Sequence, residues 1–90
     1  MIDFTKYNLD EDDIRFLAQI EDWCIGGQSE ITLECKGRTF VLEPSGKTIQ
    51  VVEVADEVAG EYENFDDLLL NYKIDGKPLI EFVKELEYGD

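Results

Sequence analysis

The longest unbroken run of acidic residues, Asp10–Asp13 (DEDD), is the first place in the sequence where a metal site could be expected. A calcium loop of the EF-hand type that began at Asp10 would need an oxygen ligand at its fifth position and glycine at its sixth. Ile14 and Arg15 occupy these positions. We therefore predict no dedicated metal site here, and we interpret the run as a helix start, where acidic side chains suit the positive end of the helix dipole.

A second possible motif is Ser45-Gly-Lys-Thr48, which contains the Gly-Lys-Thr of a phosphate-binding loop. Such a loop also needs a glycine five residues before Gly46, where this chain has Val41, and it joins a strand to a helix. The residues on both sides of this segment alternate as strands do. We predict a hairpin turn and no phosphate site.

Catalysis by the common nucleophilic pairs is excluded because the chain has no histidine. Cys24 and Cys35 fall at apolar positions of the predicted elements, which favours free, unreactive core thiols in a reducing, cytoplasmic setting. Ser29 and Ser45 lie at predicted turns and have no evident base beside them. We expect neither an enzyme nor a bound cofactor.

The segment Asn71–Ile80 (NYKIDGKPLI) combines a carboxylate, two lysines and a tyrosine, a set that could serve a catalytic or metal-binding loop. Its apolar residues suggest a structural role, because Tyr72 ends one predicted helix and Ile74 can anchor the loop in the core. Gly76 permits a turn with positive φ, and Pro78 suits the first residue of a following helix. We interpret the segment as a helix–helix connector.

The charge of the chain is strongly negative, with 22 acidic residues, 8 basic residues and a net charge of −14. Residues 1–30 and 61–90 each carry −6, whereas residues 31–60 carry only −2. Such a surface repels phosphate backbones and anionic membranes and attracts basic proteins. The acids could also serve solubility alone. No apolar stretch reaches the ~18–20 residues that a membrane span requires, and no signal peptide is predicted.

Helical spacing of apolar residues predicts a first helix that Asp10 caps and that runs to about Ile25, before Gly26-Gly27. Its apolar face is expected to contain Ile14, Phe16, Leu17, Ile20, Trp23 and Cys24. Trp23 can be interpreted in two ways. Its spacing from Ile20 favours a place in the core, and its acidic neighbours are typical of an interface anchor.

The pattern then changes to a period of two, which predicts three antiparallel strands. Lys36-Gly37 is expected to turn the first hairpin so that Leu33 faces Phe40 and Ile31 faces Leu42. After a turn at Pro44–Gly46, a third strand is expected over Lys47–Ala55. Its Val52 and Val54 should lie beside Val41 on the face away from the first helix.

The remaining residues predict an acidic loop and two helices. The loop covers Asp56–Glu63, and a short helix capped by Asn64 covers Phe65 to about Tyr72. A last helix starts at Pro78, with Leu79, Phe82, Val83 and Leu86 on one stripe. We therefore predict a single α+β domain over residues 1–90, in the order α-β-β-β-α-α, with a three-stranded antiparallel meander and helices packed on one of its faces.

This order resembles the topology of the double-stranded RNA-binding domain. That family holds phosphates with a lysine cluster at the start of its last helix. Here Pro78–Asp90 contains only Lys84 among four acids, so the resemblance does not extend to RNA binding.

From these observations we expect a non-enzymatic protein that binds a basic partner through an acidic face, as inhibitors, immunity proteins and antitoxins do. The candidate partner-binding residues are Asp10, Glu11, Asp12, Asp13, Glu21, Asp22, Trp23, Val41, Val52 and Val54. Two alternatives stay open. The helix carboxylates could mimic DNA and occupy a nucleic-acid-binding protein, or the open sheet face could join two copies of the chain as a homodimer.

Overall fold

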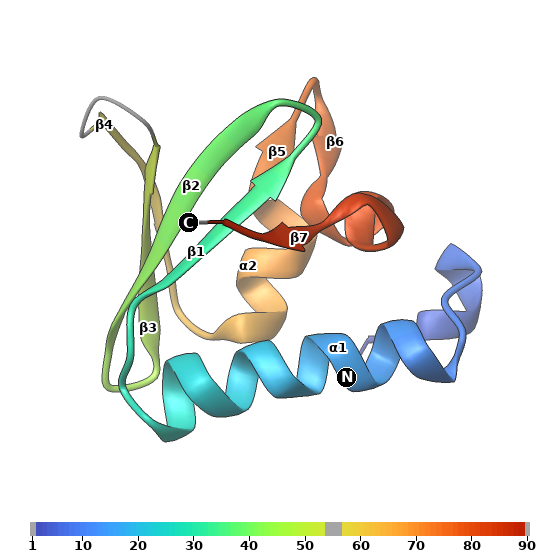
Figure 1. The fold of residues 1–90 in the computed structure, drawn as a ribbon, viewed down its shortest axis with the longest axis horizontal. Coiled ribbons are helices and arrows are strands. Elements are labelled where there is room, and N and C mark those ends of the chain that lie inside the picture. The colour runs from blue at the N-terminus through green and yellow to red at the C-terminus, as the bar shows by residue number, and fades with distance from the viewer. Residues whose placement is uncertain (1, 54–56, 90) are drawn as a thin grey trace.

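Three consecutive strands with alternating apolar and polar residues form the centre of the structure (Figure 1). In the computed structural model, which describes residues 2–53 and 57–89, they are β1 (Ile31–Cys35), β2 (Arg38–Ser45) and β3 (Thr48–Glu53). Leu33 lies opposite Phe40 and Ile31 lies opposite Leu42. This confirms the predicted register of the first hairpin.

The second hairpin is tighter than predicted. Its turn consists of Gly46 and Lys47 alone, with Ser45 paired to Thr48, and Gly46 has a φ of 63°, which glycine adopts without strain. A loop of four residues, Pro44–Lys47, would have paired Glu43 with Thr48. The pairing of β2 with β3 is therefore shifted by two residues relative to that arrangement. Because side chains alternate with a period of two, this shift leaves every residue on its predicted face.

The acidic segment predicted as a loop is instead largely a strand, β4 (Glu57–Tyr62), which pairs antiparallel with β3. Few apolar residues mark it, since an edge strand is held by backbone hydrogen bonds and tolerates charge. The β3–β4 register shifts between Val51 and Val52, next to Gly60. A side chain at Gly60 would meet the ring of Tyr62, because its Cβ would lie 2.7 Å from the hydroxyl oxygen.

The chain also ends differently from the prediction. The last helix is a shorter 3-10 helix, η3 (Leu79–Glu85), and β7 (Glu87–Tyr88) follows it and pairs with β1. The whole sheet has the order β4-β3-β2-β1-β7. The predicted stripe of Leu79, Phe82, Val83 and Leu86 is buried as expected. The free edge of β1 accounts for the change, because Gly89 donates its N–H to the Thr32 carbonyl at 2.9 Å.

The first helix agrees closely with its prediction. After a 3-10 turn, η1 (Phe4–Tyr7), helix α1 (Glu11–Glu21) begins behind Asp10 and continues into a π-helical turn, η2 (Asp22–Gly26). Leu17, Ile20 and Cys24 point into the core. Trp23 does not, since it is 48% exposed, so the structure excludes the first of its two interpretations, the place in the core. Trp23 lies on the flank of the helix where Phe16 also lies, and both rings contact Tyr88.

The second helix, α2 (Phe65–Asn71), starts at Asn64, whose side chain accepts a hydrogen bond from the Asp67 N–H at 2.7 Å. It leads into a small hairpin of β5 (Lys73–Ile74) and β6 (Lys77–Pro78). The predicted connector is therefore a hairpin. Its turn residues Asp75 and Gly76 both have positive φ, at 52° and 81°, and Ile74 is fully buried.

One hydrophobic core lies between the sheet and the helices. The inward residues of the meander include Leu33, Phe40, Leu42, Ile49 and Val51, all at most 1% exposed. In Figure 1, α1, α2 and η3 all lie on the same side of β1–β3. The α+β class, the central meander and the packing of helices on one face are as predicted.

Tyr72 joins the end of α2 to the sheet. Its ring lies between Phe40 and Tyr62, at centroid distances of 5.3 and 6.2 Å, and is 2% exposed. Its hydroxyl donates a hydrogen bond to Glu53 Oε1 at 2.7 Å. Arg38 Nη1 lies 3.5 Å from the same carboxylate oxygen. Burial and the bond to Glu53 raise the pKa of the Tyr72 phenol.

We expect Tyr72→Phe to lower the free energy of unfolding by about 1–2 kcal/mol, because it removes a hydrogen bond to a carboxylate and keeps the ring packing. The measurement is denaturant unfolding. Tyr62→Phe is the matched control, since the Tyr62 hydroxyl forms no hydrogen bond within the described residues. A loss of equal size in both variants would contradict this role of the bond.

Candidate functional site

The structure distributes the predicted partner-binding residues over four places. Asp10–Asp13 lie at the start of α1, and Glu21 lies on the flank of α1 that faces α2. Asp22 and Trp23 lie in η2, and Val41 and Val52 pair on the open face of the sheet. Val54 lies outside the described residues. No single surface therefore contains the whole predicted set.

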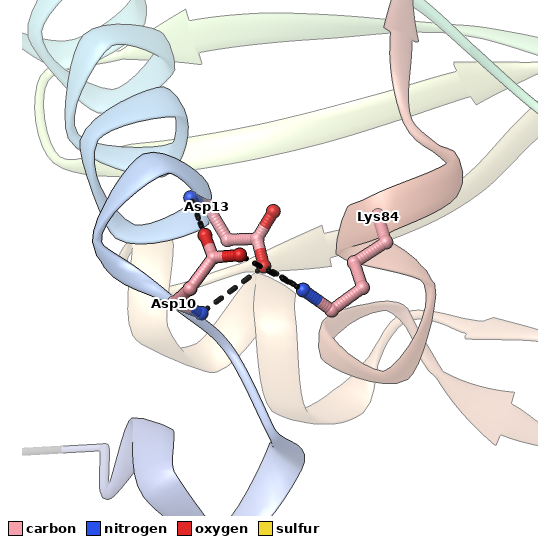
Figure 2. A network of polar contacts seen from close by, with 3 residues as sticks. All are labelled: Asp10, Asp13 and Lys84. Carbon is pink, nitrogen blue, oxygen red and sulfur yellow. Dashed lines mark hydrogen bonds and ion pairs between the residues drawn. The ribbon is translucent and has the colours of Figure 1, made fainter.

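Asp10 and Asp13 form a capping box at the start of α1 (Figure 2). Asp10 Oδ1 accepts the Asp13 N–H at 2.9 Å, and Asp13 Oδ2 accepts the Asp10 N–H at 3.2 Å. Lys84 of η3 donates to both carboxylates, so the cluster ties the C-terminal part of the chain to α1. These two acids serve the fold. Their negative charge already has a partner.

The pKa values at this cluster follow from its hydrogen bonds. The backbone N–H of Asp13 is the largest cause that lowers the pKa of Asp10, ahead of Lys84, and partial burial opposes both. The bond to Asp13 is the main cause that raises the pKa of Lys84. Glu11 and Asp12 are exposed, and Asp12 Oδ1 lies 3.2 Å from Arg15 Nη1. Two cations of the chain, Lys84 and Arg15, thus pair with three of the four acids in this run.

Trp23 belongs to a small aromatic cluster on the other flank of α1. The ring of Tyr88 lies 5.6 Å from that of Trp23 and 5.2 Å from that of Phe16, and its hydroxyl donates to Gln19 Oε1 at 3.0 Å. These contacts fasten β7 to α1. They explain why Trp23 is only half exposed although it lies outside the core.

The open face of the sheet carries an apolar row across its central strands. Thr32, Val41 and Val52 lie directly opposite one another on β1, β2 and β3. All three are partly buried by their neighbours, and no helix or strand among the described residues packs over them. This row contains two of the predicted contact residues.

Acidic rows border the apolar row on both sides. On one side Glu43 and Glu61 flank Gln50, and on the other Glu87 pairs with Glu34. Within residues 2–53 and 57–89 none of these four glutamates forms an ion pair. We call this surface, Thr32, Val41 and Val52 with Glu34, Glu43, Glu61 and Glu87, the open face.

The four glutamates were not among the predicted site residues. The signal for Glu34 and Glu43 was present in the sequence, because they alternate with the inward residues of β1 and β2. Glu61 and Glu87 could not be placed, since β4 and β7 were not predicted as strands. The acidic border therefore emerges only from the pairing of all five strands.

Both cysteine thiols of the chain are enclosed in the core. Cys24 and Cys35 are buried free thiols, as predicted, and burial raises the pKa of Cys24 to about 11. Over the described parts of the chain, no three Cys, Asp or Glu side chains converge as metal ligands would. No described helix is long and apolar enough to cross a membrane.

Comparisons with known proteins give no family assignment, since no family model, curated protein or solved structure matches this chain.

We expect Lys84→Met to lower the thermal unfolding midpoint near neutral pH, and to have little effect once the pH falls below the lowered pKa of Asp10 or rises above the raised pKa of Lys84. The lowered pKa of Asp10 means that its contribution is present above the usual carboxyl range and is lost as the pH falls through that lowered value. The raised pKa of Lys84 means that its contribution is lost as the pH rises through the raised value. Thermal unfolding monitored by circular dichroism across this range is the measurement.

The matched control is Lys73→Met, which removes an exposed lysine with no ion pair in the described parts of the chain. Because the Lys84 cluster is exposed, its effect should also shrink in about 0.5 M salt. A difference from the native chain that did not depend on pH would rule out the ionic contribution.

A second prediction concerns the thiols. With a pKa near 11, Cys24 has a thiolate fraction near neutral pH that is roughly 100-fold below that of an ordinary cysteine, before any steric protection. A disulfide reagent should therefore modify the native protein slowly and both thiols rapidly in denaturant. Fast modification of the native chain would show that the core opens readily around η2 or β1.

Proposed function

We propose that the protein is a non-enzymatic binding module that holds a basic protein partner on its open face. The observation that carries this proposal is the apolar row of Thr32, Val41 and Val52 between two borders of glutamates that have no cationic partner among the described residues. An inhibitor, immunity protein or antitoxin would use such a face in this way.

The chemistry of the face suits a partner that presents apolar side chains with lysine or arginine around them. The valines are stiff at χ1 and lose little side-chain entropy when they are covered. Contacts at the centre of an interface supply most of its affinity, and charges at its rim chiefly accelerate and orient the encounter. The net charge of −14 extends this attraction beyond the face itself.

A homodimer through the open face has less support. Two copies would each bring Glu34, Glu43, Glu61 and Glu87 to the contact. Carboxylates of like charge at a contact are destabilising unless cations separate them. A basic partner relieves this repulsion, and a second copy adds to it.

A DNA mimic also has less support than a basic-protein binder that uses the sheet. A mimic needs a regular series of free negative charges, and along α1 the carboxylates of Asp10, Asp12 and Asp13 are paired with Lys84 or Arg15. The unpaired glutamates of the open face lie on the sheet, where their spacing follows the strands.

The test is selection of binding peptides from a random displayed library on the folded, immobilised protein. We expect enrichment of sequences that combine lysine or arginine with aliphatic residues, and release of the bound peptides by about 0.5 M salt. Replacing Glu34, Glu43, Glu61 and Glu87 together by glutamine should weaken the selected peptides by roughly 10-fold or more.

The control variant replaces Glu11, Glu21 and Glu81 by glutamine and Asp22 by asparagine, which removes the same charge from exposed positions on the helices. It should retain binding within about twofold. Equal losses in the two variants, or selected sequences without basic residues, would refute the proposed face.

A further inference from the structure

A groove lies between η1, α1 and α2, and none of these three elements contributes to the open face. It has a volume of about 160 Å³. Phe4, Ile14, Leu17 and Leu69 form its apolar lining, and Glu21 and Asp66 stand at its edge. The groove therefore combines apolar walls with two carboxylates.

The two carboxylates at this edge have no counter-charge among the described residues. Glu21 and Asp66 are both exposed. Partial desolvation is the main cause that raises the pKa of Glu21, and the negative charge of Asp66 raises it further. Among the described residues neither carboxylate forms an ion pair with a lysine or arginine of the chain. A cation placed between them would relieve their repulsion.

A cation that enters the groove must also cover apolar surface. A hydrated metal ion does not, and among the described residues no third carboxylate or thiol converges with Glu21 and Asp66 to hold one. Long basic side chains cover apolar surface, because their methylene stems pack on apolar atoms while the charged end stays at the surface. Arginine suits a pair of carboxylates better than lysine, because its planar guanidinium donates hydrogen bonds along several directions and can reach both of them.

We propose that this groove is a second binding site, which receives an arginine side chain of a protein partner. The stem lies against Phe4 and Ile14, the partly exposed part of the lining, and the guanidinium lies between Glu21 and Asp66. The site is separate from the open face, so it can exist whether or not a basic partner binds there.

The test is NMR titration of the native chain with a blocked arginine residue, N-acetyl-arginine methylamide, and with its neutral citrulline analogue. We expect saturable shifts of the methyl groups of Ile14, Leu17 and Leu69 with arginine in the millimolar range, and shifts at least about fivefold smaller with citrulline. The pKa of Glu21 should fall when arginine is bound, because a nearby cation favours the ionised carboxyl.

Glu21→Gln with Asp66→Asn should abolish the arginine-specific shifts. Glu11→Gln with Glu81→Gln removes the same charge elsewhere and should leave these shifts unchanged. Three results would overturn the inference: equal shifts with citrulline, equal shifts in the two double variants, or the same shifts with guanidinium chloride alone, which would show that the groove takes a small cation and no side chain. Circular dichroism checks that both variants are folded.

Discussion

The antiparallel register of β1, β2 and β3 is the constraint on which the other features depend. It places Leu33, Phe40, Leu42, Ile49 and Val51 on one face, and this is the face that α1, α2 and η3 cover. The same register fixes what the opposite face displays. Since side chains alternate with a period of two, a slip of one residue would bury glutamates and expose the core, at a cost far above the stability of a domain this small.

Two consequences of this arrangement concern charge. The acids that stabilise the start of α1 are paired with a cation. Asp10 and Asp13 cap this helix and both bind Lys84 (Figure 2). Where acids border apolar surface they have no partner among the described residues, as on the open face and at the groove beside Glu21. Part of the excess negative charge thus lies where a basic partner could reach it, which links the composition of the chain to its proposed function.

Much of the fold could be predicted because local signals agreed with the tertiary structure. Asp10 and Asn64 cap the helices that they were predicted to cap, and the first hairpin has its predicted register. The failures have a common cause. β4 and β7 are edge strands, whose backbone hydrogen bonds form with β3 and β1 and leave little trace in apolar periodicity. Trp23 was misplaced because helical spacing alone does not determine which flank a neighbouring element covers.

The sequence by itself determined the class of the fold, the inward faces of its strands and helices, the absence of histidine chemistry and the sign of the charge. These properties depend on residue type and on spacing along one element. Only the tertiary structure decided which carboxylates are free. That outcome depends on contacts between residues far apart in sequence, such as Lys84 with Asp13 and Glu34 with Glu87, and no local pattern encodes such contacts.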